Sequence, residues 1–102
     1  MDLSINEGVL VIGGGVGDAP RSAINIKRAP RGTSAIDAEH LYLTQRFGRH
    51  GRGWQLRTRE LVYEEGRAYD LVRIELTGGD PRTLYFDVTD WLARAEGLHS
   101  GR

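Results

Sequence analysis

Cysteine is absent from the 102-residue sequence, which excludes both a disulfide framework and a thiolate site. Long apolar runs are also absent, and residues 1–7 carry no basic cluster, so we expect neither a membrane span nor a signal peptide. No membrane partner is expected either. The default expectation is therefore a cytoplasmic protein.

The composition fits one folded domain, with 27% charged and 39% hydrophobic residues. We expect a single small α+β domain over residues 1–97 and a frayed tail over residues 98–102. The net charge is zero, but residues 21–59 hold nine basic and two acidic residues, whereas residues 60–102 hold five basic and nine acidic ones. Such asymmetry indicates either an anion-binding face or charges that neutralise one another across strands.

The clearest pattern runs from Tyr69 to Trp91, where apolar and polar residues alternate twice around the turn residues 78–81. This predicts an antiparallel hairpin. Because the apolar residues of both strands must share one face, directly opposed residues have even-numbered sums. We expect a five-residue loop, 78–82, rather than a three-residue loop, 78–80. The preferred loop opposes Leu76 with Leu84, Ile74 with Phe86, Val72 with Val88 and Arg73 with Asp87.

Two strands are expected before the helix, over residues 5–12 and 23–27, with a buried run at 9–12. The intervening glycines, 13–17, invite a phosphate-binding interpretation, which requires a helix to begin within them. Pro20 and the alternation after it oppose such a helix. We therefore interpret the glycines as a flexible loop between strands.

The main helix is predicted from Ala35 to Phe47. Ser34 and Asp37 have the spacing of a capping box, and Gly48 is a natural C-terminal cap. The expected inward positions are Ile36, Glu39 or His40, Leu43 and Phe47.

After the helix, we expect a strand over 54–63 with a bulge near Glu60, a tight turn over 64–67, the hairpin, and a short helix over 91–96. The predicted fold is thus α+β with element order β-β-α-β-β-β. It has a mainly antiparallel sheet of about five strands. The main helix should pack on the face built by Val72, Ile74, Leu76, Leu84 and Phe86.

The leading functional hypothesis is a non-enzymatic interaction module that forms a homodimer or binds a protein partner. Odd-numbered positions place tyrosine, leucine and arginine together on the outer sheet face, and tyrosine and arginine are typical of interface centres. The expected interface residues are Leu61, Tyr63, Tyr69, Leu71, Arg73 and Tyr85. Two alternatives are that the short helix or the first strand covers this face, or that it lines a small-ligand pocket.

The second hypothesis is anion or nucleic-acid binding, because arginines alternate with glycine and aromatic residues between residues 46 and 59. The residues concerned are Arg46, Arg49, Arg52, Arg57 and Arg59. The competing interpretation makes Phe47 and Trp54 core anchors at the ends of a solvated loop.

A third hypothesis is a small-ligand pocket protein or enzyme, which requires a pocket with at least two ionisable groups. The sequence reveals no catalytic set: His40, His50 and His99 fall on a helix, a loop and a tail. Asp70 and Asp87 have opposite parity and face opposite sides of the sheet. We therefore expect no metal, no cofactor and no enzymatic activity.

Overall fold

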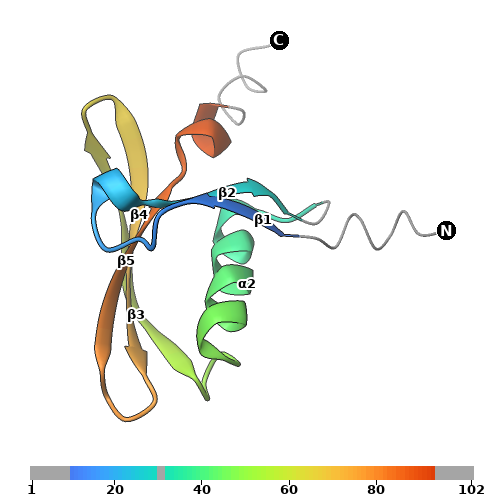
Figure 1. Cartoon of the computed structure of the whole chain (residues 1–102), viewed down its shortest axis with the longest axis vertical. Helices are drawn as coiled ribbons and strands as arrows, with labels where there is room; N and C mark the ends of the chain where they lie inside the picture. The colour runs from blue at the N-terminus through green and yellow to red at the C-terminus, as the bar shows by residue number, and fades with distance from the viewer. Residues whose placement is uncertain (1–9, 30–31, 94–102) are drawn as a thin grey trace, which may run out of the picture.

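The structure is a computed structural model that describes residues 10–29 and 32–93. Its described strands form one five-stranded sheet in the order β1-β2-β5-β4-β3, antiparallel except for the β2–β5 pair. The main helix α2 lies on one side of this sheet (Figure 1). The predicted α+β class and element order are confirmed, and residues 89–93 are helical at the predicted short C-terminal helix.

The glycine-rich segment is a loop only in part, because Gly13 and Gly14 belong to a strand and residues 15–17 lie in the connection that follows it. Strand β1 (Val11–Gly14) pairs with β2 (Ile24–Arg28), and a short 3₁₀ helix, η1 (Pro20–Ser22), joins them. Backbone hydrogen bonds continue past β1, because Gly17 donates to Ser22 and accepts from Tyr85 of β5. Val11 and Ile12 are exposed, so the predicted buried run is wrong at these two positions, and residues 5–9 lie outside the described residues.

Helix α2 (Ala35–Phe47) has the predicted bounds. The Ser34 hydroxyl accepts a hydrogen bond from the Asp37 amide at 3.1 Å, and Gly48 ends the helix with φ 104°. The inward face differs from the prediction at its start, because Ala38, Glu39 and Leu43 are buried while Ile36 is 44% exposed.

Strand β3 (Trp54–Glu64) and strand β4 (Arg67–Leu76) form a hairpin closed by a two-residue turn at Glu65 and Gly66. Both turn residues have positive φ, as this tight turn requires, and the predicted turn is confirmed. The bulge lies between Leu56 and Thr58 and not at Glu60. An extra residue there reverses the facing of the rest of β3, so Arg59 and Leu61 point to the helix side.

Strand β5 (Pro81–Asp87) pairs with β4 in a register that neither considered loop gives. Val72 opposes Leu84, and the Leu76 amide donates to the Asp80 carbonyl around a loop of residues 77–79. Gly78 and Gly79 both have positive φ, and the turn is centred two residues earlier in the chain than predicted, so the β5 partner of each β4 residue shifts by four positions. Consequently Arg73 opposes Thr83, and Asp87 forms its ion pair with Arg67 instead.

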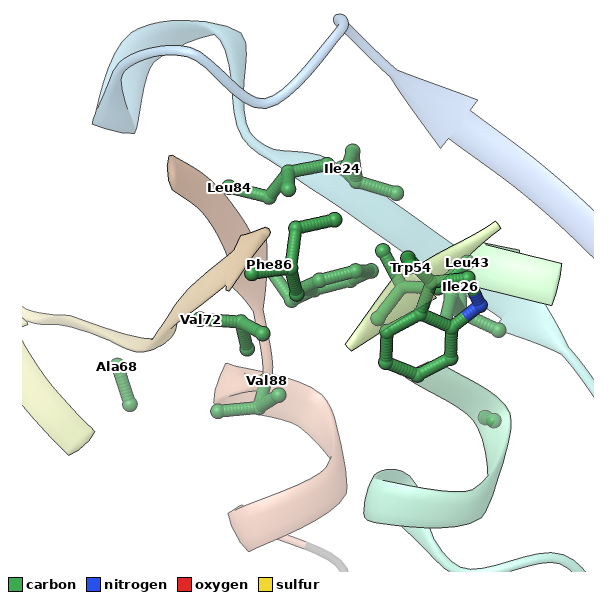
Figure 2. Close-up of a cluster of buried hydrophobic side chains, with 11 residues drawn as sticks. Ile24, Ile26, Leu43, Trp54, Ala68, Val72, Leu84, Phe86 and Val88 are labelled. Atoms are coloured by element: carbon green, nitrogen blue, oxygen red, sulfur yellow. The ribbon is translucent and has the colours of Figure 1, made fainter. Parts of the chain in front are cut away.

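The core fills the space between α2 and the sheet (Figure 2). Trp54, Leu43 and Phe86 are essentially inaccessible to solvent. Burial of one such side chain contributes roughly 1.5–3 kcal/mol of transfer free energy. The predicted helix-packed face is confirmed, with Leu76 only partly buried, and the cluster contains Ile24, Ile26, Ala38, Leu43, Trp54, Ala68, Val72, Ile74, Leu84, Phe86 and Val88.

Candidate functional site

Three charged residues meet on the helix side of the sheet. Glu39 of α2 is 2% exposed, and its Oε1 accepts a hydrogen bond at 3.2 Å from Nη2 of Arg59. The same Nη2 donates to Oδ2 of Asp70, which is also buried. One guanidinium group therefore bridges two carboxyl groups, and we call Glu39, Arg59 and Asp70 the bridged cluster.

Each member of the bridged cluster comes from a different element. Glu39 lies on the buried side of α2 one residue after Ala38. Asp70 opposes Phe86, a core residue, so it faces the helix. Arg59 reaches the same side because of the bulge between Leu56 and Thr58, after which it opposes Val72. Without that bulge the guanidinium would point to the other face of the sheet.

Burial sets the protonation state of Glu39. Desolvation, then a hydrogen bond and the charge from Asp70, raise its pKa to about 9, against the lowering effect of Arg59. Glu39 is therefore protonated at pH 7. Its Oε2 has no hydrogen-bond partner among the described residues. With Glu39 neutral, the positive charge of Arg59 balances the carboxylate of Asp70.

A cavity of about 440 Å³ opens beside the bridged cluster. Its charged lining residues are Arg59, Asp70 and Glu60, of which Glu60 pairs with Arg73, and the other lining residues are apolar. The lining residues are Ala35, Ile36, Arg59, Glu60, Leu61, Asp70, Val88, Trp91 and Leu92. An apolar cavity of this size with a few convergent polar groups is the usual form of a small-ligand site.

A second cluster gathers two of the histidines against the core. The rings of His50 and Trp54 have centroids 4.5 Å apart, and His40 lies 5.1 Å from Trp54 in an edge-on arrangement. Burial, and then the charge of His50, lower the pKa of His40. The indole Nε1 of Trp54 is buried without a hydrogen-bond partner among the described residues. Trp54 lines a smaller and mainly polar cavity of about 230 Å³, so this cluster is a weaker candidate site.

The six expected interface residues do not share one face. Leu61 opposes Asp70 and Tyr63 opposes Ala68, which places both on the helix side. Tyr69 and Leu71 lie on the outer face but are each only 7% exposed. Pro20 and Arg21 line a cavity with Tyr69, so the chain before β2 contributes to covering that face. Arg73 and Tyr85 also remain on the outer face, since Arg73 opposes Thr83 and Tyr85 opposes Leu71.

The five expected anion-binding arginines are similarly divided. Arg59 belongs to the bridged cluster, and Arg57 donates to Glu75 at 2.7 Å through Nε. Arg46 donates to the Val16 carbonyl and the Tyr42 hydroxyl, each at 3.0 Å. Only Arg49 and Arg52 lack an ion pair or a side-chain hydrogen bond within the described part of the chain. The five therefore do not form one cationic patch.

Sequence reasoning missed the bridged cluster. The carboxyl considered beside Asp70 was Asp87, on the opposite side of the sheet, whereas the structure links Asp70 through Arg59 to Glu39. One signal was available, since Glu39 occupies a position on the inward stripe of the predicted helix. The position of the bulge, which brings Arg59 to the cluster, is not encoded by the period-2 pattern.

No family model, curated protein or solved structure matches this chain. Among the described residues, no group of three or more metal-ligating side chains is close enough to hold an ion. None of the described helices has the length and apolar character needed to cross a bilayer.

Proposed function

We propose that this protein binds a small, uncharged, amphipathic molecule in the cavity beside the bridged cluster. The observation that carries the proposal is the combination of an apolar lining with Arg59 and Asp70 on one wall. This cavity meets the requirement of the small-ligand hypothesis for a pocket with at least two ionisable groups. The proposal keeps the expected cytoplasmic location, which is compatible with the lack of a membrane-spanning helix in the described residues.

The chemistry of the polar wall favours a neutral ligand group. Arg59 uses Nη2 for Glu39 and Asp70, so its other N–H groups are the donors left for a ligand. Asp70 offers carboxylate lone pairs. A primary amide matches both, because its carbonyl accepts from the guanidinium and its N–H donates to the carboxylate. A carboxylate would be repelled by Asp70 and an ammonium by Arg59.

Binding is favoured over catalysis because Glu39, the residue with the strongly raised pKa, does not line the cavity. A general acid must come within hydrogen-bond reach of the reacting group. In the proposed role, protonated Glu39 instead orients Arg59 and lets the pair of Arg59 and Asp70 stay buried at low electrostatic cost.

The test uses three matched probes: 3-phenylpropanamide, 3-phenylpropanoic acid and 3-phenylpropylamine. Binding is followed by NMR shifts of backbone amides and by the fluorescence of Trp91, which lines the cavity. The amide should bind most tightly, with shifts centred on residues 35, 61, 70 and 92. The proposal is wrong if all three probes leave these amides unmoved at millimolar concentration.

A matched pair of variants locates the site. Ile36 and Leu41 are both partly exposed on α2, at 44% and 38%, but only Ile36 lines the cavity. Replacing Ile36 by Asn should weaken amide binding about 5- to 30-fold, from about 1–2 kcal/mol of lost apolar burial. Leu41→Asn should leave the affinity unchanged. Equal effects of the two variants would place the ligand elsewhere.

Nucleic-acid binding through residues 46–59 stays a prediction with its own signature. Neutralising phosphates releases counterions, so affinity should fall steeply with salt. Arg57 and Arg59 already have carboxylate partners, and Arg46 donates to the Val16 carbonyl and the Tyr42 hydroxyl. We therefore expect Arg49 and Arg52 to contribute most. Salt-independent binding of an oligonucleotide, or none at low salt, would rule this function out.

A further inference from the structure

Beyond its bulge, one side of strand β3 is unpaired within the described part of the chain. The strand pairs with β4 alone among the described strands, and beyond the bulge a regular stretch runs from Thr58 to Glu64. No described residue hydrogen bonds to the outer edge of this stretch. Leu61 and Tyr63, on its helix side, are 45% and 70% exposed. A long regular edge with apolar side chains is a template for pairing with another strand.

A second copy of β3 is the simplest partner for this edge, and symmetry restricts how it pairs. Directly opposed residues on antiparallel strands point to the same face, and facing alternates along each strand. A twofold axis perpendicular to the sheet must therefore pass midway between one central residue and its own copy, which oppose each other directly. Only a few centres are available between Thr58 and Glu64.

Charge eliminates most of these centres. A centre at Arg59, Glu60 or Glu64 opposes identical charges, and one at Val62 opposes Glu60 with the partner's Glu64. Like charges directly opposed destabilise a strand pair. A centre at Thr58 runs across the bulge, and one at Tyr63 leaves only three residues per strand in register.

The remaining centre, Leu61, is self-complementary. Leu61 opposes its own copy. Arg59 opposes the partner's Tyr63, and its guanidinium, which is already hydrogen bonded to Glu39 and Asp70, can lie over the tyrosine ring in a cation–π contact. Glu60 opposes the partner's Val62, and Thr58 opposes the partner's Glu64, so no like charges meet.

We propose that two copies of this chain pair through β3 in the Leu61-centred register, forming one continuous ten-stranded sheet. This keeps the homodimer hypothesis but moves its surface from the outer face of the sheet to its edge. Tyr63 and Leu61 are shared by both versions, whereas Tyr69, Leu71, Arg73 and Tyr85 are not part of the edge.

The absence of native cysteine allows a direct test of the register. In this register the two Leu61 Cα atoms are about 4.5–5.5 Å apart, within the range that a disulfide spans. Leu61→Cys should therefore give a disulfide-linked dimer on mild oxidation. Val62→Cys is the matched control, because its copies are offset by two residues and lie roughly 8 Å apart. Stronger linkage at position 62 than at position 61 would overturn the register.

A charge pair at Val62 tests the dimer without a new covalent bond. Val62→Glu opposes the partner's Glu60 twice per dimer, whereas Val62→Lys creates two attractive pairs. Because both pairs of the dimer contribute, Val62→Glu should raise the dimer dissociation constant about 2- to 30-fold, and Val62→Lys should lower it by a similar factor. Light scattering during size-exclusion chromatography measures both. A wild-type protein that stays monomeric at 0.1 mM (on the order of 1 mg/ml), or equal shifts from the two variants, refutes the proposal.

Discussion

Replacing Glu39 with glutamine should make the protein more stable, and increasingly so as the pH rises. The carboxyl of Glu39 has a pKa of about 9 in the folded protein, whereas in the unfolded chain it ionises near the ordinary glutamate pKa of 4.5. Between these values the folded state binds one more proton than the unfolded state. Stability from this group is therefore complete below about pH 4.5 and is lost as the pH rises towards 9.

The size of the effect follows from the pKa difference. Each pH unit within the window costs about 1.4 kcal/mol, so the loss between pH 5 and pH 8 is up to about 4 kcal/mol. Glutamine has the same shape and does not ionise. Its carbonyl can accept from Arg59, and its amide nitrogen takes the place of Oε2 without introducing a charge. The difference in unfolding free energy between Glu39→Gln and wild type should therefore be small at pH 5 and reach a few kcal/mol at pH 8.

Urea unfolding at several pH values, followed by the fluorescence of buried Trp54, measures this difference. Taking the difference removes the contributions of groups that titrate equally in both proteins. Glu60→Gln is the control, because Glu60 is exposed and pairs only with Arg73 at 3.4 Å. Its difference should stay flat within a few tenths of a kcal/mol. A flat difference for Glu39→Gln as well would show that Glu39 is ionised in the folded protein and refute the reasoning.

Three other predictions follow from particular contacts. Asp70→Asn should lower the pKa of Glu39, because Asp70 raises that pKa and Arg59 lowers it. Carboxyl-selective NMR titration measures the pKa, and an unchanged value would contradict the prediction. Gly17→Ala should destabilise the protein by several kcal/mol in urea unfolding, because its Cβ would lie 2.6 Å from Cδ1 of Ile24. The control Gly51→Ala, which has positive φ but open space around its Cβ, should cost only about 1 kcal/mol. Equal costs would be inconsistent with a close contact between Gly17 and Ile24. His40 should titrate below 6.5 in ring-proton NMR spectra, and His50→Asn should raise the pKa of His40. Because a lowered histidine pKa costs stability as the pH falls below about 6.5, the same variant should also reduce the loss of stability at acidic pH. An unchanged pKa of His40 would exclude coupling between the two rings.

Local chemistry alone determined much of this fold. The Ser34 cap and Gly48 fixed both ends of α2, because each satisfies backbone groups within a few residues of itself. Alternation in the β4 and β5 segments identified both strands and the face that packs on the helix. The tight turn at Glu65 and Gly66 was likewise evident, since glycine after a strand end adopts positive φ without cost.

Tertiary structure decided register and facing, and with them the candidate site. The sequence pattern favours any even-numbered register of β4 with β5, and the actual one depends on where Gly78 and Gly79 close the turn. One residue of bulge in β3 brings Arg59 to Glu39 and Asp70 and turns Leu61 towards the helix. The pKa of Glu39 then depends on burial by elements distant in the chain. Such effects arise from contacts between segments, so no local pattern contains them.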